Sequence, residues 1–356
     1  MKNITDVDTN FKVNTSLNKT DIRFYDAQEA PFSIYGLLYE DGKFRRIPKA
    51  VAESLNENIV LLHSHTAGGR IRFRTASPYI AIYAEMPSMS HMVHFPFTGS
   101  VGFDLYIREN GIDRYVKTFI PPMKELPVLE NIIELDSSVT ASGMREFTIH
   151  MPLYSDVSRV YIGLSEQASV AEATPYRDLK PIVYYGSSIT QGGCASRAGN
   201  AYQNIITRRL NVDHINLGFS GNAKGEDEMT EHIRSLDMSV FVLDYDYNAP
   251  STEHLRATHE RMFQAIRAEH PTLPIVMLSR PKNFLTDEEH ERVEIIRKTY
   301  HHALENGDQN VYFIEGHDLM GLTNGDGTVD GCHPNDLGFF SMASVLGDLL
   351  EEVLKG

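Results

Sequence analysis

Cysteine and tryptophan are scarce in this chain of 356 residues, which contains only Cys194 and Cys332 and no tryptophan. Two cysteines are too few for a disulfide framework, and such scarcity is typical of a reducing compartment. The chain also lacks a run of eighteen apolar residues, and its first residues show no apolar segment of the secretory type. We therefore expect a cytoplasmic protein that does not interact with membranes.

Positive charge is also in deficit, because 33 lysines and arginines face 48 aspartates and glutamates, which gives a net charge of -15. Such a chain repels phosphate backbones and anionic lipids, so we expect no nucleic-acid partner. One hydrophobic core rarely organises a chain of this length, and 42% apolar residues can fill two cores. The composition therefore indicates a globular protein of two domains. It leaves the oligomeric state open, and a homo-oligomer is compatible with it.

The first half of the chain alternates between apolar and polar residues over short stretches. Examples are residues 79–84, 146–151 and 160–164. This period of two is typical of strands, and turn signals such as Asn110-Gly111 separate the stretches. No amphipathic helix of three turns interrupts them. We therefore predict an antiparallel β-sandwich domain over residues 21–175, preceded by a polar arm at residues 1–20.

The second half shows a different pattern, in which an apolar run of strand length and a helical stretch alternate five times. The predicted strands are 182–185, 214–217, 240–243, 275–278 and 311–314, and the predicted helices are 201–210, 226–236, 252–270, 287–306 and 334–354. This alternation predicts an α/β domain over residues 176–356, with a parallel sheet between two helical layers. Sites in such sheets lie at the carboxyl ends of the strands.

Ser188 directly follows the first of these strands, in the segment Gly186-Ser187-Ser188-Ile189-Thr190-Gln191-Gly192. A serine on a tight turn between strand and helix can expose its hydroxyl, and its N–H can face a developing oxyanion. An ordinary turn or a phosphate-binding loop explains this segment nearly as well, although the lysine of a Walker-type loop is missing.

The loops after the second and third strands carry Gly221 and Asn248. A glycine lets the backbone approach a ligand and offer an N–H, and an asparagine amide can donate to the same oxyanion. Taken alone, each residue is typical of an ordinary turn or a helix cap.

Asp330 and His333 lie three residues apart immediately before the last helix. At this spacing the carboxylate can accept from one ring nitrogen while the other nitrogen faces the serine. The Asp-x-x-His pattern is common in turns and carries little information by itself. Four such blocks at the ends of four strands together indicate a catalytic site.

These four blocks resemble those of the SGNH/GDSL hydrolase family, over about residues 176–356. The resemblance implies a five-stranded, flavodoxin-like SGNH sheet, with Ser188 as nucleophile, His333 as general base and then acid, and Asp330 as its partner. It also implies an oxyanion hole made by the N–H groups of Ser188 and Gly221 and the amide of Asn248. The chain departs from the family in two places: Ser187 replaces the usual aspartate, and Asp246-Tyr247-Asn248-Ala249 replaces Gly-x-Asn-Asp.

The segment Gly102-Phe103-Asp104-Leu105-Tyr106 resembles the GxDLY signature of a domain that precedes SGNH domains in some bacterial hydrolases. This resemblance implies a jelly-roll-like β domain beside the catalytic one. Taken one by one, Asp104 and Tyr106 are better explained as partners in core or interface hydrogen bonds.

Two other pairs of residues have a spacing or position that could indicate a site. His63 and His65 have the spacing to share one face of a strand, but no carboxylate or cysteine cluster nearby completes a metal site. We therefore predict packing or surface histidines, no metal and no cofactor. Cys194 and Cys332 flank two of the blocks, and we expect them to remain unpaired thiols.

The resemblance, together with the residues, predicts a serine esterase that hydrolyses short-chain esters, in particular O-acetyl esters, on oligo- or polysaccharides. Without tryptophan, a sugar must stack on another aromatic side chain, for which Tyr202 and Tyr247 are candidates. Three alternatives stay open: an acyltransferase, a lipase or acylhydrolase with the same triad, and a non-catalytic carbohydrate-binding protein on an esterase scaffold.

Overall fold

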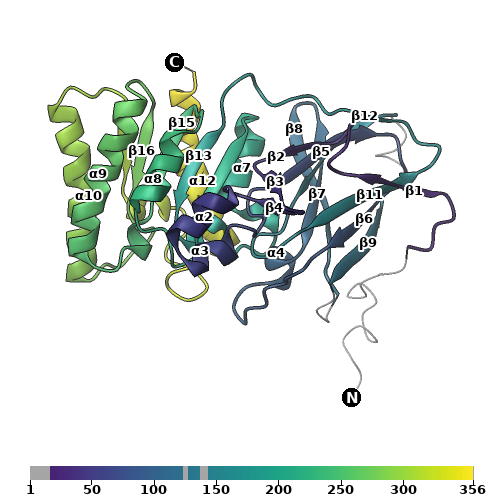
Figure 1. Cartoon of the computed structure of the whole chain (residues 1–356), viewed down its shortest axis with the longest axis horizontal. Coiled ribbons are helices and arrows are strands. Elements are labelled where there is room, and N and C mark those ends of the chain that lie inside the picture. The colour runs from purple at the N-terminus through teal and green to yellow at the C-terminus, as the bar shows by residue number, and fades with distance from the viewer. Residues whose placement is uncertain (1–16, 123–126, 137–142, 356) are drawn as a thin grey trace.

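The chain forms two units that lie side by side, an antiparallel β-sandwich from its first half and a layered α/β unit from its second half (Figure 1). The computed structural model describes residues 17–122, 127–136 and 143–355. Most of the predicted N-terminal arm, residues 1–16, lies outside the described residues.

The sandwich consists of two antiparallel sheets that enclose one hydrophobic core. The first sheet has the order β1 (Ile22–Asp26), β11 (Arg159–Ser165), β6 (Tyr79–Glu85), β9 (Val128–Glu134). The second has the order β12 (Val170–Ala171), β5 (Arg70–Thr75), β10 (Arg145–His150), β7 (Phe103–Glu109), β8 (Ile112–Phe119), and β2 (Ser33–Tyr35) also pairs with β5. The predicted alternation is plain in β9, where buried and more accessible residues take turns. The predicted antiparallel architecture is confirmed.

One segment of the first half adds two helices to the other unit. It begins with the hairpin of β3 (Leu38–Glu40) and β4 (Lys43–Arg45), whose Phe44 joins the sandwich core, and continues with α2 (Lys49–Leu55) and α3 (Glu57–Leu62). Ala52 and Ile59 of these helices join the core of the α/β unit. The sequence did not reveal the helices, because each has at most two turns and too few residues to show an amphipathic period. A further short helix, α4 (Phe97–Ser100), precedes β7.

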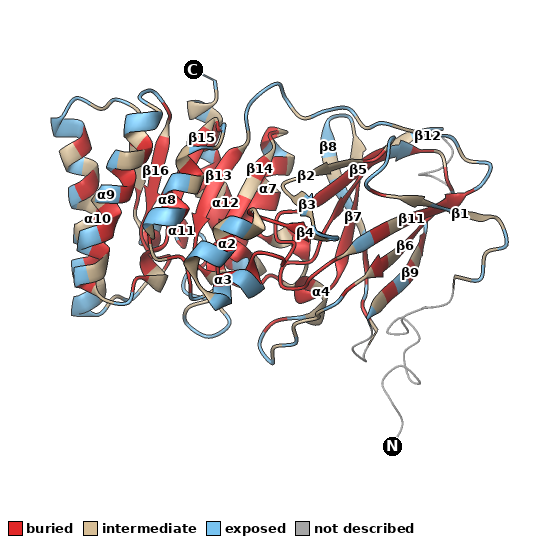
Figure 2. Ribbon diagram, in the orientation of Figure 1, coloured by how far each residue is buried: buried red, intermediate tan, exposed pale blue. Residues whose placement is uncertain are grey.

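The α/β unit contains the predicted five-stranded parallel sheet. Its order is β14 (His214–Gly218), β13 (Ile182–Gly186), β15 (Val240–Asp244), β16 (Ile275–Leu278), β17 (Val311–Ile314). Numbered along the chain, this order is 2-1-3-4-5, the flavodoxin-like order that the resemblance implies. Every residue of β13, β15 and β16 is buried, because helices cover both faces of the sheet (Figure 2). Strands buried in this way consist mainly of apolar residues, which is why they appear as apolar runs in the sequence.

Two helical layers cover the sheet. Tyr184 of β13 faces the core shared with α7 (Tyr202–Leu210) and α12 (Asp336–Val353). Its neighbour Tyr185 faces the core shared with α8 (Asp227–Arg234), α9 (Thr252–Glu269) and α10 (Asp287–Glu305). A short helix, α11 (Gly316–Leu319), follows β17. Within the described ranges, none of the helices combines the length and the apolar character needed to cross a bilayer.

The GxDLY-like segment joins the two units. Asp104 on β7 is fully buried and accepts hydrogen bonds from the Thr118 hydroxyl and the Gly199 N–H, both at 2.7 Å. Arg197, two residues before Gly199 on the α/β side, forms an ion pair with Asp104 at 3.3 Å and contacts the Tyr106 hydroxyl. This interface supports the structural interpretation of Asp104 and Tyr106 as hydrogen-bonding residues.

Candidate active site

Ser188 begins α6 (Ser188–Gln191), a short helix directly after strand β13, which lies between β14 and β15. The Ser187 hydroxyl caps this helix by accepting the Ile189 N–H at 3.2 Å. The turn needs Gly186, because an added Cβ would lie 2.4 Å from the Asp244 carbonyl oxygen. Ser187 thus stabilises the loop at the position where related proteins usually have aspartate, and it leaves the Ser188 side chain accessible at the carboxyl edge of the sheet.

Asp330 organises the loop that carries His333. One carboxylate oxygen accepts the backbone N–H groups of Cys332 at 2.9 Å and His333 at 2.7 Å. The other lies 2.8 Å from His333 Nδ1. Burial alone would raise the pKa of Asp330, but the hydrogen bonds from the His333 ring and from the two backbone groups lower it to about 2. The carboxylate is therefore ionised at neutral pH and selects the ring tautomer with a proton on Nδ1.

The remaining ring nitrogen of His333, Nε2, lies 2.9 Å from the Ser188 hydroxyl oxygen. The structure thus brings Ser188, His333 and Asp330 into one continuous chain of hydrogen bonds, although 145 positions separate the serine and the histidine. A neutral imidazole in this tautomer accepts a proton at Nε2. The arrangement can therefore deprotonate the hydroxyl as it attacks an electrophile.

Hydrogen bonds of backbone and side-chain groups fix the two loops relative to each other. The N–H of Cys194, just after α6, donates to the Pro334 carbonyl at 3.1 Å. The Ser196 N–H donates to the Asp336 carboxylate at 2.8 Å, and the Ser196 hydroxyl contacts the same carboxylate. These contacts make the distance between Ser188 and His333 a property of the fold rather than of two free loops.

The predicted oxyanion donors come from the loops that follow β13, β14 and β15, three neighbouring strands. Ser188 is the first residue of its helix, so its N–H has no acceptor within the helix. Gly221 has a φ of +68°, and no acceptor for its N–H lies within bonding distance among the residues that the structure describes. Asn248 donates one amide hydrogen to the Phe219 carbonyl at 2.9 Å and keeps a second one.

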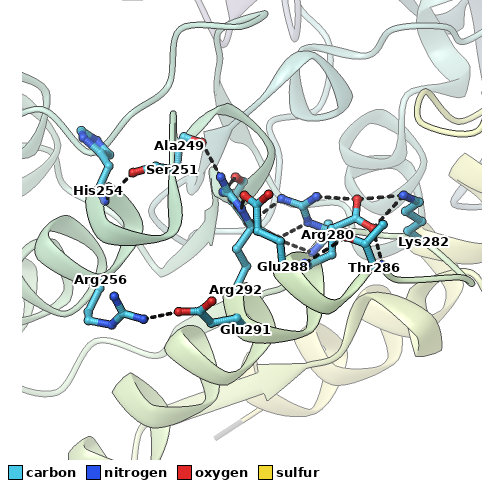
Figure 3. A network of polar contacts seen from close by, with 12 residues as sticks. Ala249, Ser251, His254, Arg256, Arg280, Lys282, Thr286, Glu288, Glu291 and Arg292 are labelled. Carbon is cyan, nitrogen blue, oxygen red and sulfur yellow. Dashed lines mark hydrogen bonds and ion pairs between the residues drawn. The ribbon is translucent and has the colours of Figure 1, made fainter.

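A buried ion-pair network holds the turn η3 (Asp246–Asn248), which carries Asn248. Asp246 accepts two hydrogen bonds from the Arg280 guanidinium, at 2.8 and 2.9 Å. Arg292 donates to the Asp246 backbone carbonyl at 3.1 Å. It also donates to the Ala249 carbonyl at 3.0 Å (Figure 3). Here Asp246, two residues before Asn248, anchors the turn. Sequence reasoning missed this role, because the arginines lie on distant elements.

The first half of the chain also contacts the nucleophile loop. The Tyr154 hydroxyl donates to the Ser188 carbonyl at 3.2 Å, and burial raises the pKa of Tyr154, so its proton stays in place. His65 Nδ1 lies 3.2 Å from Gln191 Nε2 at the end of α6. Burial, followed by the charge of Arg46, lowers the pKa of His65 to about 4. His65 is therefore a neutral packing residue, as predicted.

The structure contradicts one predicted substrate contact and leaves the other possible. Tyr202 is fully buried in α7, where its ring packs against Tyr184 and Phe339, so it cannot receive a substrate. It follows the nucleophile loop in sequence, but its helix turns the ring into the core. Tyr247 is half-buried beside the site, and its ring lies 4.7 Å from the Arg280 guanidinium. Cys194 and Cys332 are both free thiols.

Two family models match the chain. The GDSL-like lipase/acylhydrolase family matches residues 179–351, and the N-terminus of SGNH-hydrolase-type esterases matches residues 22–170. No curated protein matches the sequence.

Several solved structures are similar over nearly their whole length. A GDSL-like lipase structure from Bacteroides ovatus ATCC 8483 has 29% identity and a TM-score of 0.84, with 94% of this chain and 98% of that chain covered. The salicylyl-acyltransferase SsfX3 from a tetracycline biosynthetic pathway has 20% identity and a TM-score of 0.75, covering 95% and 99%. A family two carbohydrate esterase from Cellvibrio japonicus has 12% identity and a TM-score of 0.60, covering 94% and 98%. The α/β unit thus matches the GDSL-like lipase/acylhydrolase family, and the sandwich matches the N-terminal domain of the GxDLY type.

Proposed function

We propose that this protein is a serine esterase in which Ser188 is the nucleophile, His333 the general base and then acid, and Asp330 the partner of His333. The observation that carries this proposal is the chain of hydrogen bonds from the Ser188 hydroxyl through both ring nitrogens of His333 to Asp330, at 2.9 and 2.8 Å. A non-catalytic binding protein has no need of an oriented base beside a reachable hydroxyl.

The reaction follows from these contacts. Ser188 Oγ adds to the ester carbonyl while His333 Nε2 takes its proton, and Asp330 stabilises the imidazolium that forms. The N–H groups of Ser188 and Gly221 and the amide of Asn248 supply the donors for the oxyanion. His333 then protonates the leaving alcohol. Water repeats the sequence on the acyl-enzyme and restores the free serine.

We infer that the substrates are short acyl esters, in particular O-acetyl groups, on oligo- or polysaccharides. A cavity of about 190 Å³ lies beside the His333 loop, lined by Gly331 and Thr328 of that loop and by Phe284 and Lys282 opposite. Phe284 is 85% exposed, so its ring is available for stacking against a sugar in a chain without tryptophan. Similar structures include family two carbohydrate esterases and an acetyl xylan esterase, which supports this substrate class.

A second candidate function is acyl transfer to an alcohol other than water. The similarity to a salicylyl-acyltransferase favours it, and so do exposed apolar side chains such as Phe284 and the fully exposed Val93, which can bind an apolar acceptor. The two functions differ in the fate of the acyl-enzyme. If added acceptor alcohols capture the acyl group in preference to water, the protein is a transferase.

Acetate release from acetylated oligosaccharides and from a panel of short-chain esters tests the proposal. We expect turnover by the wild-type protein and a loss on the order of 10⁶-fold in Ser188→Ala. Ser344→Ala is the matched control, because this serine lies partly exposed on α12 with its hydroxyl bonded to the Phe340 carbonyl, and its loss should leave the rate unchanged. Equal rates for Ser188→Ala and wild type would refute the triad. Rapid cleavage of long acyl esters with no action on acetylated sugars would refute the substrate class alone.

A further inference from the structure

The loop between β6 and α4 carries an exposed histidine to the edge of the proposed triad. His94 Nε2 lies 3.8 Å from an Asp330 carboxylate oxygen, and the rings of His94 and His333 are 5.8 Å apart, centre to centre. This histidine belongs to the first half of the chain and takes no part in the proposed reaction. Its side chain is 44% exposed, so it can turn without disturbing the core.

A buried thiol faces the same point from the α/β unit. Cys194 follows α6, its backbone N–H is bonded to the Pro334 carbonyl, and its sulfur is not in a disulfide. One ring nitrogen of His94, one of His333 and the Cys194 sulfur all lie within 4.8 Å of one another. Two imidazoles and a thiolate form a ligand set that is typical of zinc.

We propose that His94, Cys194 and His333 bind a zinc ion, and that this binding reversibly inhibits the enzyme. On binding, the Cys194 thiol releases its proton to solvent, and the sulfur bonds to the metal. Water or the nearby Asp330 carboxylate supplies a fourth ligand. Nitrogen and sulfur donors disfavour magnesium and calcium, which prefer oxygen, so the site selects zinc and related transition metals.

The geometry needs only a small adjustment. Bonds of about 2.0 Å to nitrogen and 2.3 Å to sulfur in a tetrahedral site place ligand atoms roughly 3.3 to 3.8 Å apart. The observed separations of up to 4.8 Å must therefore shrink by about 1 Å. Because Cys194 and His333 are fixed by the contacts between their loops, the exposed His94 makes most of this movement.

Inhibition follows from the proposed role of His333 and rests on it. A neutral imidazole has one nitrogen with a free lone pair. If zinc takes Nε2, Ser188 loses its base directly. If zinc takes Nδ1, the hydrogen bond to Asp330 is lost and the ring proton moves to Nε2, which can then no longer accept the serine proton. Either mode stops nucleophilic attack.

The three ligands lie far apart in the chain, which is why no metal site could be predicted from the sequence. His94 is in the first half, and Cys194 and His333 are 139 positions apart by their numbering. They come together only because the loop between β6 and α4, which carries His94, packs against the loop that carries His333.

Zinc titration of the full-length protein tests the inference, with each variant's rate normalised to its own rate in chelator. We expect micromolar zinc to inhibit the wild type, chelator to restore the rate, and His94→Gln and Cys194→Ser each to raise the half-inhibitory concentration at least tenfold. His91→Gln, on the same loop, and Cys332→Ser, beside His333, are the matched controls and should keep wild-type sensitivity. Equal sensitivity in all five proteins would overturn the site.

Cobalt binding gives a readout that does not need esterase activity. Co²⁺ replaces zinc at tetrahedral sites and shows a sulfur-to-metal charge-transfer band only when a thiolate is bound. We expect this band in the wild type, its loss in Cys194→Ser and its weakening in His94→Gln. Cobalt binding in a protein that hydrolyses no ester would refute the proposed function and keep the metal site. An active enzyme that shows neither this band nor inhibition by zinc would refute the metal site and keep the proposed function.

Discussion

At the scale of single residues, two side chains explain how this sequence departs from its family pattern without losing the site. The Ser187 hydroxyl caps α6, and Asp246 anchors the turn that carries Asn248. The sequence showed only that the usual residues were missing, because the bonds that replace them form after folding. The sequence alone was enough to find Ser188, Asp330 and His333, because each lies in a recognisable block after a strand. Their roles stay a proposal until tested.

The cap at Ser187 can be tested by comparing alanine with aspartate. Ser187→Ala should lower the free energy of unfolding by about 1 kcal/mol, because the Ile189 N–H loses its acceptor. Ser187→Asp retains an acceptor at the same position and should be close to wild type. Denaturant unfolding measures both. If alanine proved as stable as aspartate, the cap would have no part in holding the loop.

Asn248 is the oxyanion donor whose role can be separated from folding. Asn248→Ala should reduce kcat on the order of 100- to 1000-fold while leaving KM almost unchanged, because the donor acts on charge that develops only in the transition state. Asn222→Ala, in the neighbouring glycine block, is a matched control for loop stability. An Asn248→Ala enzyme with normal kcat would remove this residue from the oxyanion hole.

At the scale of elements, the second half was predicted closely and the first half less so. Parallel strands are buried on both faces, so they read as apolar runs, and helix ends carry signals such as Gly307. The short helices α2 and α3 give no such signal, and the inward turn of Tyr202 depends on how α7 rotates over the sheet. The packing of α7 against the rest of the unit determines that rotation, so the sequence near Tyr202 does not predict it.

The end of β15 carries a carboxyl group that the proposed reaction does not use. Asp244 is buried and accepts the Thr190 hydroxyl at 3.0 Å. Burial raises its pKa from 3.8 to about 8, so it is protonated at neutral pH. Between these two pH values the unfolded chain loses the proton that the folded chain keeps. The free energy of unfolding should therefore fall as pH rises through this window.

Asp244→Asn should remove that dependence, because an amide does not titrate. We expect the unfolding free energy of the variant to rise relative to that of the wild type between pH 5 and pH 7.5, by at most about 1.4 kcal/mol per pH unit. Denaturant unfolding at several pH values measures it. A constant difference across this range would contradict the raised pKa of Asp244.

At the scale of the whole molecule, the sandwich and the α/β unit form one structure around the site. Asp104 bonds to Gly199, and Tyr154 bonds to the nucleophile loop. The GxDLY-like segment signalled a partner domain, but which contacts cross the interface became visible only in the structure. The positions of Gly199 and Ser188 therefore depend on residues that lie 95 and 34 positions away from them in the chain.

Asp104→Ala should destabilise the protein by roughly 3 kcal/mol or more, because it leaves the Gly199 N–H and the Arg197 guanidinium without their buried partner. Asp104→Asn keeps an acceptor and should cost less. Asp237→Ala breaks the exposed pair with Lys180 and, as a control, should change stability by less than about 1 kcal/mol. Thermal unfolding compares the three. Equal effects of Asp104→Ala and Asp237→Ala would contradict the role of this interface.

Labelling with a fluorophosphonate, followed by mass mapping of the modified peptide, tests the central claim most directly, because the reagent phosphonylates only an activated serine. The proposed triad predicts one adduct per chain, on Ser188, formed rapidly in the wild type and far more slowly in His333→Ala. An unlabelled wild-type protein, or an adduct on a different serine with Ser188 unmodified, would contradict it.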